Sequence, residues 1–118
     1  MKMRHKAMSA GLVLLAALAA GCFRNTSSEI ELAIPEMATP ACEEIVREAV
    51  AALGMEPEGP IEEIRTDSQA RKAWVVFDNV RLGRRNIEVV VRHAGFAVND
   101  LPADEEQRAK LPKECGGP

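Results

Sequence analysis

The residues of this chain best suited to chemistry are its three cysteines, Cys22, Cys42 and Cys115. Cys42 is predicted to lie in or near the first turn of a helix, where the helix dipole stabilises a thiolate. Soft metal ions such as Cu(I) and Hg(II) prefer thiolate ligands, and thiolates also suit Zn. One thiolate makes a weak site, so the chemistry of Cys42 depends on a second sulfur.

Cys115 is the candidate for that second sulfur. The chain between Asn99 and Cys115 can reach roughly 50 Å if extended, which is enough to return to Cys42 across a small domain. The pair would form either a disulfide or a split two-thiolate metal site. In an exported protein the disulfide is the commoner outcome.

Cys22 follows a segment typical of an export signal. Lys2, Arg4 and Lys6 precede an apolar run that is too short to span a bilayer. The run ends in Gly21-Cys22, which resembles a bacterial lipobox, so we expect Cys22 to be lipidated and to anchor the exported chain to the membrane of the cell envelope. In a cell with two membranes, this would be the outer membrane or its periplasmic face. The alternative is ordinary cleavage at a nearby small-residue site, which would leave Cys22 free.

The charge of the chain argues against several functions. The full chain carries 15 basic and 18 acidic residues, and removing the signal leaves 12 basic residues and a net charge of −6. An acidic domain is a poor candidate for nucleic-acid binding. No catalytic triad, phosphate loop or cofactor fingerprint is present, so we expect a protein that is not an enzyme.

The helices and strands that would position these cysteines can be predicted from the spacing of apolar residues and from the residues that start or end such elements. Thr39 and Pro40 form a helix start, and Gly54 forms a stop. Residues 86–95 are ambiguous, since their β-branched content favours a strand, but their apolar spacing favours a helix, which we predict. The predicted strands are 29–34, 61–66, 73–77 and 96–98, and the predicted helices are 40–53, 86–94 and 104–111.

This order, β-α-β-β-α-β, predicts an α+β, ferredoxin-like fold with a four-stranded antiparallel sheet and two helices on one face. We expect a signal over residues 1–21, a tether over 22–27, the domain over 28–99 and a C-terminal tail over 100–118. Trp74 would lie on the open sheet face. This face would either bind a partner or be covered by the C-terminal tail through Leu101 and Leu111, and we predict that the tail covers it.

The segment Met37-Ala38-Thr39-Pro40-Ala41-Cys42 resembles the Met-x-Cys-x-x-Cys loop of heavy-metal-associated (HMA) domains, the family of copper chaperones and the periplasmic mercury-binding protein. Ala73-x-Val75-x-Phe77-Asp78 is similar to the third strand of that family, and Ala94-Gly95-Phe96 to the junction before its fourth strand. The resemblance covers roughly residues 28–99. It implies a ferredoxin-like fold and soft-metal binding.

Two departures qualify what the resemblance implies. Thr39 stands where the first ligand would be, and the loop over residues 54–60 is longer than is usual in the family. The candidate metal ligands are therefore Cys42 and Cys115, with Met37 expected in the core and His93 on the surface. The implied partners are the membrane and a metal-transfer protein. The alternative function is a structural or interaction lipoprotein that kept the fold and lost the metal.

Overall fold

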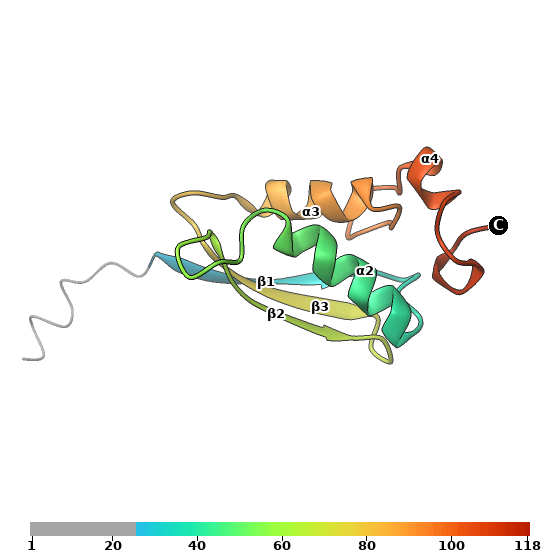
Figure 1. Ribbon diagram of the computed structural model, residues 1–118, viewed down its shortest axis with the longest axis horizontal. Coiled ribbons are helices and arrows are strands. Elements are labelled where there is room, and N and C mark those ends of the chain that lie inside the picture. Colours follow the sequence, from blue (N-terminus) through green and yellow to red (C-terminus); the bar gives the residue numbers. More distant parts are fainter. Residues whose placement is uncertain (1–25) are drawn as a thin grey trace, which may run out of the picture.

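The computed structural model describes residues 26–118, in which three strands form one antiparallel sheet of order β1-β3-β2. Two helices cover one face of this sheet, and the C-terminal segment lies beyond one end of it (Figure 1). The expected signal and Cys22 lie outside the described residues. The elements are β1 (Ser27–Ala33), α2 (Pro40–Ala51), β2 (Ile61–Asp67), β3 (Lys72–Asp78), α3 (Arg84–His93), α4 (Glu105–Arg108) and a 3₁₀ helix, η1 (Lys113–Cys115).

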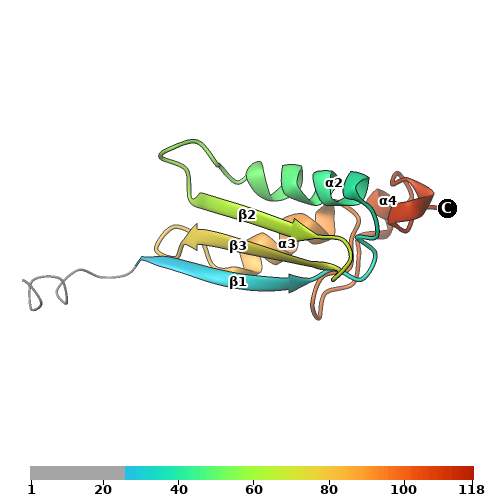
Figure 2. The ribbon, with the colours of Figure 1, turned by 90° about the horizontal axis from the view of Figure 1, so that it is seen from below.

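Residues of β1 and β3 alternate between a more buried and a more exposed face, as in a half-buried antiparallel sheet, and β2 departs from this alternation at a register shift between Ile61 and Glu63. In the register of β1 and β3, Leu32 lies opposite Ala73 and Ile30 opposite Val75. These side chains face the helices, and Leu32, Ala73 and Val75 are fully buried. The helices α2 and α3 pack on this face, so the core lies between the sheet and the helices (Figure 2).

Two of the three predicted helices, those over residues 40–53 and 86–94, are present as α2 and α3, whereas the third, predicted over residues 104–111, is shorter and covers only Glu105–Arg108. Thr39 caps α2 in an extended conformation, and Pro40 occupies its first turn. The ambiguous segment is helical, as predicted from its apolar spacing, since α3 buries Ile87 and Val91 on the core side. Gly95, with φ of +107°, follows α3 in a conformation that favours glycine and ends the helix.

The prediction of a fourth strand over residues 96–98 is wrong for the described part of the chain. Asn99 donates one backbone hydrogen bond to Ala33, at the end of β1, and the chain then leaves the sheet. Val98 and Leu101 pair with each other across a tight turn, at 3.0 and 2.8 Å. Asn99 has a φ of +51°, a left-handed conformation that Asn adopts more readily than most residues and that turns the chain away.

The prediction that the tail covers Trp74 is also wrong. Leu101 and Leu111 pack against the core cluster and not on the open sheet face. Trp74 is instead contacted by side chains of the open face itself. The guanidinium of Arg65 lies 5.5 Å from the Trp74 ring centroid, and the indole N–H donates to Glu31 at 3.2 Å. The half-buried Trp74 thus has a cation–π contact and a hydrogen bond with charged neighbours on its own face.

Candidate functional site

Cys42 and Cys115 form a disulfide at the end of the sheet where β1 leads into α2. Their Cα atoms are 5.6 Å apart, although the two residues are 73 positions apart in the sequence. Both cysteines are fully buried. The structure therefore brings the two candidate ligands together as a bridge that closes the loop resembling an HMA metal site.

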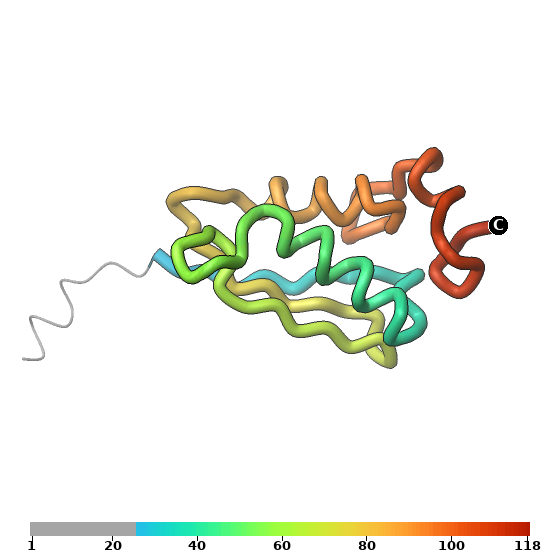
Figure 3. Tube along the Cα trace, viewed as in Figure 1, coloured from blue at the N-terminus to red at the C-terminus, as the bar shows by residue number. Residues whose placement is uncertain are grey.

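Arg108 also holds the C-terminal tail against this loop. Its guanidinium lies 2.7 Å from the carboxylate of Glu36, just before the segment 37–42 that resembles an HMA metal loop. Its Nε donates to the carbonyl of Gly116 at 3.0 Å. A Cβ atom on Gly116 would lie 2.2 Å from the Glu36 carboxylate and would displace it, and the φ of +101° at this position also favours glycine. Figure 3 shows the tail as it passes the end of α3 and bends back toward the start of α2.

Thr39, which stands in the place of a ligand, is the N-cap of α2. The backbone N–H of Cys42 donates to the Thr39 hydroxyl at 3.4 Å, and that hydroxyl lies 3.2 Å from the Cys42 sulfur. Capping of this kind satisfies a backbone donor that the first turn of a helix otherwise leaves free. Met37 is fully buried in the core, as expected from the resemblance.

No group of three or more His, Cys, Asp or Glu side chains is placed to hold a metal ion between residues 26 and 118. In the bridged form neither sulfur is a thiolate, so the residues present do not fit a metal ion in this state. His93 has a largely exposed side chain and lies 3.4 Å from Asp104. The backbone N–H of Gln107 holds the pKa of Asp104 below its usual range, and the contact with His93 acts in the same direction.

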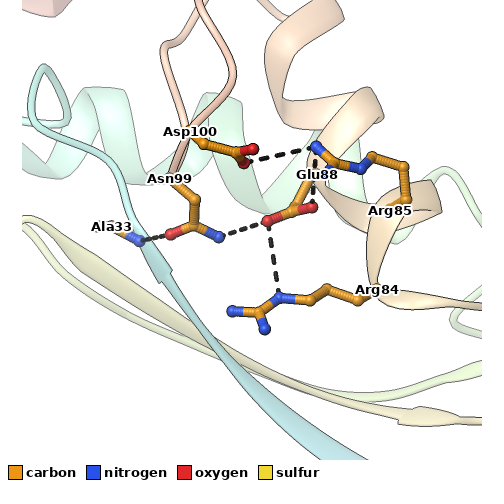
Figure 4. Close-up of polar contacts among 6 residues, drawn as sticks. All are labelled: Ala33, Arg84, Arg85, Glu88, Asn99 and Asp100. Carbon is orange, nitrogen blue, oxygen red and sulfur yellow. Dashed lines mark hydrogen bonds and ion pairs between the residues drawn. The ribbon is translucent and has the colours of Figure 1, made fainter.

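A polar cluster that was not predicted from the sequence surrounds the buried carboxylate of Glu88 (Figure 4). The carboxylate of Glu88, on α3, is 4% exposed and accepts a hydrogen bond from Asn99 at 2.6 Å. The side-chain oxygen of Asn99 accepts from the backbone N–H of Ala33 at 2.9 Å. Arg84 and Arg85 lie 3.6 and 3.5 Å from the same carboxylate. The useful signal in the sequence was an acidic residue with two arginines three and four positions before it on one helix.

The fold is therefore an α+β domain in which two helices cover one face of an antiparallel sheet. It is similar to the crystal structure of oxidized MerP from Ralstonia metallidurans CH34, with a TM-score of 0.55 and 19% sequence identity. The match covers 62% of this chain and 94% of that chain, and at this identity it shows the fold alone. No protein-family model and no curated protein matches the sequence. None of the helices within residues 26–118 is both long enough and apolar enough to span a bilayer.

Proposed function

We propose that this protein is an exported, lipid-anchored HMA-like domain that binds or relays a soft metal ion through Cys42, with Cys115 as the second thiolate. The observation that carries the proposal is the meeting of these two sulfurs at the start of α2, from positions far apart in the chain. The HMA-type fold, similar to oxidized MerP, supports a metal-binding function for this end of the domain.

Metal binding requires reduction of the bridge. A dithiol reductant would supply two electrons and two protons, become a disulfide itself, and leave Cys42 and Cys115 as thiols. Binding of the metal then displaces both thiol protons, because thiolates are the ligands. The start of α2 and the Thr39 hydroxyl, 3.2 Å from the Cys42 sulfur, favour the thiolate there.

The small number of ligands bears on which metal is bound. Thiolates suit both Cu(I) and Zn, but structural zinc sites almost always use four ligands. Within the described residues the two cysteine sulfurs meet, and no third His, Cys, Asp or Glu completes a group with them. Cu(I) or Hg(II) therefore suits the reduced pair better than Zn does.

The direction of the chain suits a site that is presented to a partner. The chain enters β1 at Ser27, at the end of the sheet opposite to the bridge, and the C-terminal tail lies beyond the other end (Figure 1). A lipid on Cys22 would hold the first end close to the membrane. The end with Cys42 and Cys115 would then point away from the membrane, toward a metal-transfer protein.

A second candidate is a non-enzymatic structural or interaction lipoprotein that kept the fold and lost the metal. The observation in its favour is that Thr39 caps α2 and the bridge is fully buried, so the oxidised loop is complete without a metal ion. In this case the bridge would only stabilise the tail.

The two candidates are separated by titrating Cu(I) into the full chain, purified in detergent, before and after reduction with a phosphine. We expect one Cu(I) per reduced chain, no binding to the oxidised chain, and loss of binding in both Cys42→Ser and Cys115→Ser. If reduced Cys42→Ser binds Cu(I) as well as the parent does, the metal-binding proposal is wrong and the structural candidate stands.

The lipid anchor is tested separately by Cys22→Ser. We expect the parent to fractionate with membranes and the variant to be released from them. Equal fractionation of the two proteins would contradict lipidation at Cys22, whatever the outcome of the metal titration.

A further inference from the structure

The outer edge of β1 carries backbone groups that no other strand of the described chain pairs. β1 pairs only with β3, at one edge of the three-stranded sheet. The N–H of Ile34 donates toward the β3 side, to Arg71, whereas the N–H and C=O of Ala33 bond on the opposite side, to Asn99. Since successive residues alternate in direction, the N–H and C=O groups of Glu29 and Glu31 also point away from β3.

This edge is open because the chain turns away at Asn99. Asn99 closes only the last residue of β1, Ala33, and its side chain is held in turn by the buried Glu88 (Figure 4). The following residues go to the tail that carries Cys115 to Cys42. Figure 2 shows β1 at the margin of the sheet with no described element alongside most of its length.

We propose that the outer edge of β1 accepts an extended segment of a partner protein as a fourth strand, with basic side chains at alternate positions of that segment. Unpaired strand edges are templates for pairing with another chain, and addition of a strand is a recurring mode of peptide recognition. The Asn99 contact sets one end of the available edge, so the added strand pairs with the outward backbone groups of Glu29 and Glu31.

The negative charge of the open sheet face favours a partner segment with basic side chains. The exposed glutamates of β1 and β2 outnumber the basic residues of the face. Glu29 shares Arg65 with Glu63, and Glu31 lies 3.5 Å from Lys72, so the four glutamates of the face have only two basic partners. The glutamates are Glu29, Glu31, Glu62 and Glu63, and the basic residues are Arg65 and Lys72. Lys or Arg on the neighbouring strand would face Glu29 and Glu31 at the spacing that stabilises cross-strand pairs.

The same charges disfavour a second copy of this chain on the edge. An antiparallel pairing of two β1 edges would set Glu29 or Glu31 of one copy opposite Glu29 or Glu31 of the other. Like charges directly opposite each other destabilise a sheet. The partner segment is therefore one that differs in charge from β1 itself.

The test uses the full chain in detergent and a seven-residue peptide in which Lys and Val alternate. We expect binding that weakens with salt, together with slower hydrogen exchange of the Glu29 and Glu31 amides, measured by NMR. The same peptide N-methylated at its pairing amides should not bind. If the methylated peptide binds equally well, the attraction is ionic only and strand addition is wrong.

The matched variants are Glu31→Pro and Glu31→Ala. The amide of Glu31 points away from β3, so proline removes the outward donor and leaves the bonds to β3 in place. We expect Glu31→Pro to weaken peptide binding about tenfold or more, and Glu31→Ala to weaken it much less. Equal binding to Glu31→Pro and Glu31→Ala, both folded by circular dichroism, would overturn the proposal. Dimerisation of the parent that Glu31→Pro abolishes would overturn the choice of partner. Neither result depends on metal binding at Cys42.

Discussion

The hydroxyl of Thr39 lies 3.2 Å from the sulfur of Cys42 within the first turn of α2. Thr39 occupies the place where the resemblance to HMA domains puts a ligand, and it caps the helix instead. The second sulfur comes from Cys115, on a tail that follows the part of the chain resembling an HMA domain. The loop thus has a capped helix and a bridge where the related motif has two neighbouring thiols.

Restoring the missing thiol should restore metal affinity. Thr39→Cys places two sulfurs three residues apart at the start of α2, and we expect reduced protein to bind Cu(I) on the order of tenfold more tightly, or about 1.4 kcal/mol. Thr39→Ser is the control, because it keeps the cap without adding a thiol. Equal Cu(I) affinity of the two reduced variants, in competition with a chromogenic chelator, would show that the loop does not have the expected geometry.

Removing the bridge should destabilise the domain substantially. Cys115→Ala opens a loop that spans 73 positions, and loss of such a cross-link costs about 4 kcal/mol in the chain-entropy model. The measurement is chemical denaturation of the variant and of the parent with and without reductant. Reduced parent should unfold close to Cys115→Ala, and a parent whose midpoint does not respond to reductant would contradict the contribution of the bridge.

Arg108 should protect the bridge from reduction. Arg108→Gln loses the ion pair with Glu36 and the bond to the Gly116 carbonyl, so the tail opens more often. We expect thiols to appear several-fold faster in dithiothreitol, with a loss of about 1 kcal/mol in stability. Arg65→Gln, which removes an exposed pair on the open sheet face, is the control and should be reduced at the parental rate.

Asn99 should be required both for its side-chain bonds and for its backbone conformation. Asn99→Gly loses the bonds to Ala33 and Glu88 but tolerates a positive φ, so we expect a loss of about 1 to 2 kcal/mol. In Asn99→Ala the alanine must also adopt a left-handed conformation that it disfavours, so this variant should lose about 1 kcal/mol more in free energy of unfolding than Asn99→Gly. The two free energies of unfolding, measured in urea, should differ in this order, and the reverse order would contradict the role of the backbone.

Glu43 should make stability depend on acid pH. The hydrogen bond from the Thr66 hydroxyl, 2.6 Å away, holds the pKa of the Glu43 carboxyl below its usual range, with Ser68 and Arg47 acting in the same direction. A carboxyl with a depressed folded-state pKa stabilises the fold above the ordinary glutamate pKa of about 4.3. The contribution is lost as the pH falls through the depressed value.

Glu43→Gln should therefore be slightly less stable than the parent at neutral pH and should approach it as acid protonates Glu43. The measurement is urea unfolding between neutral pH and acid, and Glu44→Gln, at an exposed position, is the control. A constant difference between the parent and Glu43→Gln over this range would contradict the assignment.

The sequence by itself determined the local elements, because their signals are short-range. Apolar alternation predicted β1, the apolar Ile61 and Ile64 predicted β2, and β-branched and aromatic content predicted β3. Apolar spacing with a glycine stop predicted α3 despite its run of β-branched valines. Thr39 and Pro40 predicted the start of α2 for the same reason. The positions of the three cysteines in the sequence were also enough to name Cys42 and Cys115 as candidate metal ligands or as a disulfide pair.

Only the tertiary structure decided what happens after α3. Residues 96–98 have the apolar pattern of a strand, and Phe96 and Val98 are fully buried, so no local signal showed that the strand ends at once. The end depends on Asn99 meeting both Ala33 and the buried Glu88, which are distant in the sequence. The same turn opens the edge of β1 and sends the tail back, and the return of Cys115 to Cys42 depends on where a whole folded domain places the two ends of the chain.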